Sequence, residues 1–113
     1  MPTWKTDLPT ILILQFVSRG QEIPVKSQVD LEQNSLDMDA RMRNLDYPKQ
    51  FEYLSLRDLF CDPTGCMTSV GSDMHTDLVV WDYGHLTSAG AKFVIDHKLG
   101  SMIMDALGEP KTN

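Results

Sequence analysis

The sequence lacks long hydrophobic runs and clusters of basic residues, and each absence argues against a class of protein. Its longest apolar run, residues 11–14 followed by Phe16 and Val17, is far shorter than the roughly 20 residues that a membrane-spanning helix requires. Only 10 Lys and Arg stand against 16 Asp and Glu, and the basic residues are scattered along a chain of net charge −6. Because nucleic-acid binding rests on clustered basic side chains, we expect neither a transmembrane segment nor a nucleic-acid partner.

A leader segment is also missing from the sequence as it stands. Residues 1–5 show no charged stretch followed by an apolar one, so we expect no signal peptide and a cytoplasmic location if the chain is made alone. With 113 residues and 42% hydrophobic composition, the chain has the size of one globular domain or part of one, spanning residues 1–113.

Cysteine is scarce, and the two that occur lie close together. Cys61 and Cys66 flank Asp-Pro-Thr-Gly, a turn sequence that brings their Cα atoms within bridging distance. We predict a local disulfide that contributes about 2 kcal/mol and persists only in an oxidising compartment, in conflict with the N-terminus. Four zinc ligands, Cys61, Cys66, His75 and His85, are the weaker alternative because their spacing is poor.

Hydrophobic patterning predicts alternating helices and strands. Residues 11–17 read as a buried strand or a short helix, and the pattern does not decide between them. The other expected elements are a helix over 31–45, a strand over 51–54 followed by a short helix over 56–60, a loop over 61–76, an apolar stretch over 78–81, and a helix capped by Thr87 or Ser88 that runs to about Leu107.

This alternation favours α/β layers. Two or three strands are too few for a self-sufficient sheet, so we expect an incomplete sheet with a further segment on the N-terminal side.

The chemistry that the residues support centres on Asp82 and His85, three positions apart after an apolar segment. A turn there lets the carboxylate accept the imidazole Nδ1–H, which orients a catalytic histidine and stabilises its imidazolium form. The plainer alternative is a turn aspartate beside a hydrogen-bonded loop histidine.

Residues 82–91, DYGHLTSAGA, resemble the last sequence block of SGNH hydrolases, D-x-x-H-L-[ST]-x-x-G-A. Together with the preceding C-x4-C, the block is similar to the SGNH domain of membrane-bound family 3 acyltransferases, which O-acylate cell-surface polysaccharides. Residues 1–9 also resemble a Pro-x-Trp…Leu-Pro segment of that family.

The resemblance implies a flavodoxin-like, three-layer α/β/α domain in which Asp82 and His85 complete a Ser-His-Asp triad. It further implies an acyl donor, a carbohydrate acceptor, an upstream membrane acyltransferase domain, a periplasmic or other extracytoplasmic location, and no cofactor.

The sequence departs from the family pattern where the nucleophile belongs. No Gly-Asp-Ser block and no oxyanion-hole Gly and Asn blocks occur, and residues 71–73, Gly-Ser-Asp, have the right letters in the wrong order. We therefore expect a C-terminal fragment of an acyltransferase or esterase that is inactive alone. The alternative is a non-catalytic binding or scaffold protein that retains the end of the fold.

Three further residues are candidates for a ligand role. Trp4 and Trp81 suit a sugar site, but each lies beside an apolar segment, and we expect core packing for both. His97 lies between Asp96 and Lys98 and is expected on the surface.

Overall fold

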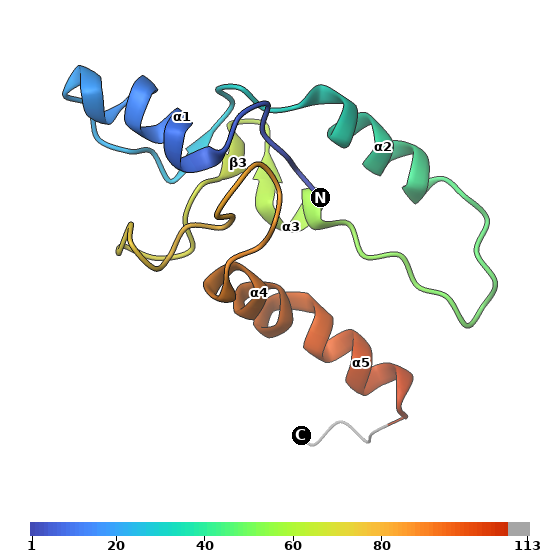
Figure 1. Cartoon of the computed structure of the whole chain (residues 1–113). Helices are drawn as coiled ribbons and strands as arrows, with labels where there is room; N and C mark the ends of the chain where they lie inside the picture. The colour runs from blue at the N-terminus through green and yellow to red at the C-terminus, as the bar shows by residue number, and fades with distance from the viewer. Residues whose placement is uncertain (109–113) are drawn as a thin grey trace.

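The computed structural model describes residues 1–108, in which helices surround a small sheet (Figure 1). The elements in chain order are α1 (Leu8–Gln15), the 3₁₀ turn η1 (Val17–Arg19), β1 (Lys26–Ser27), α2 (Gln33–Arg43), α3 (Leu56–Phe60), β2 (Cys61–Asp62), β3 (Gly65–Met67), α4 (Ser88–Val94), the π-helical turn η2 (Ile95–Leu99) and α5 (Gly100–Ala106). This mixture of helices and short strands confirms the predicted α/β class.

The apolar segment over residues 11–17, which the pattern left open, is helical: residues 11–15 belong to α1, Phe16 is its C-cap and Val17 begins η1. Asp7 caps the helix because its carboxylate accepts a hydrogen bond from the Thr10 N–H at 3.0 Å. Pro9 lies in the first turn, where a missing N–H has no intrahelical partner to lose. The buried face of α1 consists of Leu8, Ile11 and Leu12.

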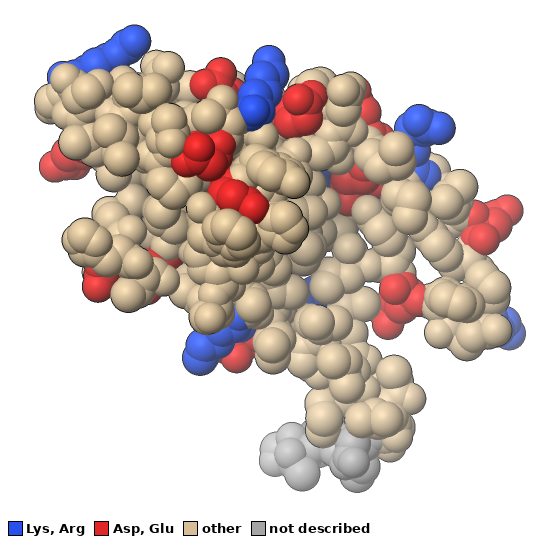
Figure 2. Space-filling view, in the orientation of Figure 1, with Lys and Arg blue, Asp and Glu red and all other residues tan. Residues whose placement is uncertain are grey.

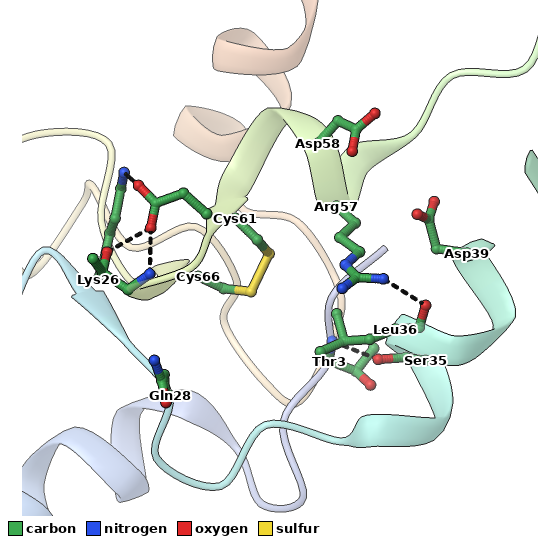
Figure 3. Close-up of a disulfide and its surroundings, with 12 residues drawn as sticks. Thr3, Lys26, Gln28, Ser35, Leu36, Asp39, Arg57, Asp58, Cys61 and Cys66 are labelled. Atoms are coloured by element: carbon green, nitrogen blue, oxygen red, sulfur yellow. Dashed lines mark hydrogen bonds and ion pairs between the residues drawn. A yellow bond between two sulfur atoms is a disulfide. The ribbon is translucent and has the colours of Figure 1, made fainter.

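The expected loop over 61–76 instead contains a β-hairpin. Its strands pair Cys61 with Cys66 and Asp62 with Gly65, and β1 adds to the other side of β3 to give an antiparallel sheet in the order β1-β3-β2. The predicted disulfide joins Cys61 and Cys66 across this hairpin, with their Cα atoms 4.0 Å apart (Figure 3). Gly65 has φ 133°, and a Cβ there would lie 2.5 Å from the Ser27 carbonyl carbon, so the turn requires glycine.

The predicted strand over 51–54 is wrong. The chain between α2 and α3 is irregular and forms a long outward loop (Figure 1). The only sheet within the described residues is β1-β3-β2, so the backbone of this segment has no strand to pair with, and its side chains are tied to α2: the Tyr53 and Ser55 hydroxyls donate to the buried Asp39 carboxylate at 2.6 and 2.8 Å.

Asp39 is the centre of a polar network that ties α2 to α3. Arg43 donates to Asp39 at 3.0 Å and to Asp58 at 2.7 Å. Burial raises the pKa of Asp39, but the hydrogen bonds from Tyr53, Ser55 and Arg43 outweigh it, so the pKa lies below its ordinary value. The same carboxylate raises the pKa of Tyr53 to about 12. Sequence patterning missed this network because its members come from two separate segments.

The C-terminal helix is the element that the sequence predicts best. α4, η2 and α5 follow one another without a break over 88–106, and Thr87 caps the start by accepting from the Gly90 N–H at 3.0 Å. Phe93 on α4 stacks on Phe60 of α3 at a centroid distance of 5.6 Å. The core is completed by the buried residues Trp4, Leu8, Ile11, Leu12, Cys66, Val79, Val80 and Val94.

Gly90 sets the distance between α4 and the core. A Cβ at this position would lie 2.4 Å from the Val79 carbonyl oxygen. We expect Gly90→Ala to lower the free energy of unfolding by about 1–3 kcal/mol through overpacking, opposite in sign to the gain that alanine gives in an open helix. Urea unfolding measures the effect. Ser88→Ala, an exposed change on the same helix, is the control, and a stabilised Gly90→Ala variant would contradict the close approach.

The Asp39 network should make stability depend on acid. We expect Asp39→Asn to lower the free energy of unfolding at neutral pH by about 1–3 kcal/mol, because Arg43 loses a charged partner. Since the pKa of Asp39 is lowered on folding, its contribution is complete above its unfolded pKa of about 3.9 and disappears as pH falls through the folded value.

The wild type and Asp39→Asn should therefore converge in acid when urea unfolding is repeated across pH. Asp37→Asn, an exposed change on the same helix, should follow the wild type at every pH. A gap between wild type and Asp39→Asn that stays constant below pH 4 would argue against an ionised, hydrogen-bonded carboxylate.

Candidate functional site

The Asp–His loop, defined here as residues 79–87, leaves the core and returns to it. Val79 and Val80 are fully buried, so the loop starts from a fixed point. The Trp81 N–H donates to the His85 carbonyl at 3.1 Å, and the Thr87 N–H donates to the Val79 carbonyl at 3.0 Å. These bonds close a tight turn that presents residues 82–84 at its tip.

The N-terminal segment clamps this tip. The Leu8 N–H, in the first turn of α1, donates to the Asp82 carbonyl at 3.0 Å, and the Trp4 N–H donates to the Tyr83 carbonyl at 2.9 Å. Because the clamp uses only backbone groups, it leaves the side chains of Asp82 and Tyr83 free for other contacts.

Within the loop, Asp82 and His85 meet. One carboxylate oxygen of Asp82 accepts from the Gly84 and His85 N–H groups at 2.8 and 2.7 Å, and the other lies 2.5 Å from His85 Nδ1. Desolvation raises the pKa of Asp82, but these hydrogen bonds and the nearby imidazole outweigh it and hold the pKa below its usual value. Asp82 is thus an ionised partner at neutral pH.

The arrangement leaves one imidazole nitrogen for chemistry. A carboxylate at Nδ1 favours the tautomer with its proton there, so Nε2 carries the lone pair. The His85 side chain is 63% exposed whereas that of Asp82 is 17% exposed, so the imidazole is open to a reactant and its partner is sheltered. Such a pair can accept a proton at Nε2 and stabilise the resulting imidazolium.

Two aromatic side chains flank His85. Trp81 stacks on its ring at 5.6 Å with an interplanar angle of 24°, and Tyr83 approaches edge-on at 5.7 Å. The expectation that Trp81 packs in the core is wrong: it is 62% exposed, because it is the first loop residue after the buried Val80. Trp4, in contrast, is buried as predicted.

The remaining candidates lie away from this chemistry. Cys61 and Cys66 form a disulfide, so the alternative zinc set lacks its thiolates. His75 is exposed in the loop after β3, and His97 is exposed on η2, where it stacks on Phe93. Residues 1–108 contain no group of three side chains placed to hold a metal ion.

No hydroxyl nucleophile joins His85 within the described part of the chain. Its ring makes no hydrogen bond there to a Ser or Thr side chain. Ser72, in the Gly-Ser-Asp sequence over 71–73, is exposed in an irregular segment. The loop therefore holds an acid–base pair without a nucleophile beside it.

A polar groove that sequence patterning missed lies between α2 and the hairpin. It has a volume of about 550 Å³, and Arg57 reaches across it to donate to the Leu36 carbonyl at 3.2 Å (Figure 3). Arg43, Arg57, Asp58 and Asp62 line it; Arg43 pairs with Asp58, and Asp62 pairs with Lys26. Arg43 is already paired within the Asp39 network, so we assign the groove a structural role.

Charges elsewhere on the surface are dispersed. Figure 2 shows Lys and Arg side chains lying apart from one another among Asp and Glu, with no basic patch on the visible face. No helix within residues 1–108 combines the length and the apolar character needed to cross a membrane.

Fold and loop together define an α/β domain that carries a hydrogen-bonded Asp–His pair on an exposed loop. A family model described as SGNH domain (fused to AT3 domains) matches residues 9–97, most of the sequence, and the chain belongs to this family. Among solved structures, it is similar to the periplasmic domain of a lipopolysaccharide acetyltransferase from Salmonella ser. Paratyphi A, with a TM-score of 0.80 and 28% identity. The similarity covers 92% of this chain but 39% of that one, so this chain spans about two fifths of that relative. No curated protein matches it.

The geometry of the Asp–His loop predicts how its amides exchange with solvent. We expect Asp82→Ala to speed hydrogen exchange of the Gly84 and His85 amides, because both lose their acceptor. NMR exchange measurements check this. The Val79 amide, which donates to the Thr68 carbonyl at 3.0 Å, should keep its protection, and unchanged rates at Gly84 and His85 would contradict the hydrogen bonds to Asp82.

Proposed function

We propose that this chain is the C-terminal part of an SGNH-type O-acyltransferase or esterase that acts on cell-surface polysaccharide. The family match and the likeness to a lipopolysaccharide acetyltransferase domain support the reaction class. The observation that carries the proposal is the 2.5 Å contact between Asp82 and His85 Nδ1 on a clamped, exposed loop.

In this proposal His85 serves as general base and then as general acid. Its Nε2 takes the proton of a serine hydroxyl while the serine Oγ attacks the acyl carbonyl of the donor. The bond from the acyl carbon to the donor's leaving group breaks, and the leaving group receives that proton. Asp82 holds the ring in position and stabilises the imidazolium between the two transfers.

The second half-reaction delivers the acyl group. A sugar hydroxyl gives its proton to His85 Nε2 as its oxygen attacks the acyl-serine, and the proton returns to the serine Oγ as the ester to the enzyme breaks. Transfer to water in place of the sugar is the esterase reaction. Both steps need only proton transfer and nucleophilic attack, with no cofactor.

The serine and its oxyanion-hole donors belong, on this proposal, to a segment outside these 113 residues. Helix α1 supports this, because it is apolar on opposite faces: Ile13 and Leu14 are 55% and 58% exposed although Ile11 and Leu12 are buried. A helix that is apolar all round normally lies between two layers. The radius of gyration of 15.9 Å also exceeds the roughly 13 Å typical of a compact domain of this length.

The same proposal places the complete protein's SGNH domain outside the cytoplasm, next to a membrane acyltransferase domain. The family description, fused to AT3 domains, supports the membrane partner, and the solved relative is a periplasmic domain. The Cys61–Cys66 disulfide agrees with an oxidising compartment.

Activity measurements test the division of the site. We expect no p-nitrophenyl acetate hydrolysis by the 113-residue chain, and activity in a longer polypeptide that restores the preceding segment. In that polypeptide His85→Ala should lower kcat on the order of 10⁴-fold, because the general base is lost. His75→Ala, a change at an exposed histidine, should leave the rate unchanged.

Either of two results would overturn the proposal. Activity of the short chain that depends on His85 would require a nucleophile within residues 1–113. A cooperative, fully stable short chain combined with an inactive longer polypeptide would instead favour a free-standing scaffold.

A further inference from the structure

The two aromatic side chains beside His85 are largely exposed, and the hydrogen bonds that anchor their loop come from the backbone. Trp81 and Tyr83 are 62% and 55% exposed, and the clamp on their loop uses the backbone carbonyls of Asp82 and Tyr83. Within residues 1–108 the Tyr83 hydroxyl makes no hydrogen bond. Two large side chains therefore face solvent on a loop that backbone hydrogen bonds hold in place.

Their placement differs from that of the other exposed apolar groups. Ile13 and Leu14 on α1 are aliphatic, as expected for a face that another layer covers. Trp81 and Tyr83 instead flank an imidazole that must stay open to reactants, Trp81 by stacking and Tyr83 by its edge. A layer that covered both rings completely would also close the imidazole to its substrates, so a ligand of the site fits the pair better.

The local chemistry narrows the class of ligand. Indole and phenol rings pack on the C–H faces of sugars, and a free phenolic hydroxyl can bond to a sugar hydroxyl. The carboxylate of Asp82 lies in this loop, and Asp7 is next in sequence to Leu8, which bonds to the loop; their negative charge disfavours an anionic group such as the phosphates of a nucleotide-bearing acyl donor. A neutral saccharide satisfies both conditions.

We propose that Trp81 and Tyr83 form the platform that binds the acceptor saccharide and sets one of its hydroxyls against His85 Nε2. The inference rests on the proposed acyl transfer to a carbohydrate. Trp81 packs against the pyranose ring, and Tyr83 donates to one of its hydroxyls. Both are positioning residues, because the proton moves at His85 and not on either ring.

Binding is measured on the 113-residue chain, which needs no nucleophile for it. In saturation-transfer NMR, ring protons of neutral methyl pyranosides should receive magnetisation from the protein. Trp81→Ala should weaken binding about tenfold, and Tyr83→Phe about fivefold. Phe51→Ala, a change at a ring that is likewise 62% exposed but lies between α2 and α3, should bind like the wild type.

A measurement without substitutions covers the case in which a variant unfolds. In nitrogen-edited spectra of the wild type, the indole N–H of Trp81 should shift as methyl pyranoside is added, while that of the buried Trp4 stays in place. Three results would each overturn the inference: no transfer to any pyranoside, equal binding by wild type and Trp81→Ala, or transfer to hexanoate but to no sugar.

Kinetics of the longer polypeptide separate this inference from the proposed function. Trp81→Ala should raise the KM for the saccharide about tenfold more than it raises the KM for p-nitrophenyl acetate, because hydrolysis of that ester uses no sugar. His85→Ala should abolish hydrolysis yet still bind pyranosides. If His85→Ala is inactive but Trp81→Ala leaves the KM for the saccharide unchanged, the platform is rejected and the proposed function stands. If the chain binds sugar but activity does not depend on His85, the proposed function is rejected and the platform stands.

Discussion

The two backbone hydrogen bonds from Leu8 and Trp4 to the carbonyls of Asp82 and Tyr83 are the constraint on which the rest of the structure depends. They join the N-terminal segment to the Asp–His loop, so the first turn of α1 both packs in the core and holds that loop in place. Because these hydrogen bonds use backbone carbonyls, they do not involve the side chains of the loop. The Asp82 carboxylate is then free to order two amides of its own loop and to hold His85 by Nδ1.

Away from the loop, polar and covalent links supplement a small core. The Asp39 carboxylate gathers Tyr53, Ser55 and Arg43 and so secures an irregular segment that has no sheet to join. The Cys61–Cys66 disulfide closes the hairpin that follows α3. Charge-assisted hydrogen bonds at a buried carboxylate are stronger than neutral ones, which suits a segment that buries little apolar area. The apolar outer face of α1 marks where further packing would be gained.

The pair of Asp82 and His85 is exposed enough to meet reactants and ordered enough to keep its geometry before they arrive. Preorganisation of this kind lowers the reorganisation required when charge develops on the imidazole. On the proposed platform, the flanking rings of Trp81 and Tyr83 would apply the same principle to substrate placement, because a rigid aromatic surface loses little entropy when a sugar binds to it. A loop that is clamped at its backbone can thus present chemistry and recognition together.

Local signals in the sequence determined several elements and one family. Thr87 with the following apolar period marked the last helix, residues 82–91 carried the Asp–His pair, and the turn between the cysteines indicated their disulfide. Tertiary structure decided what local signals cannot: α1 buries Leu8, Ile11 and Leu12 in the core, and residues 51–54 are no strand because no neighbouring strand pairs with them in the described chain. Trp81 followed an apolar run and yet is exposed, since the chain turns outward directly after Val80. The hydrophobic period of the sequence indicates which residues prefer burial. Which residues they pack against or bond to depends on how distant segments of the chain come together in the folded structure.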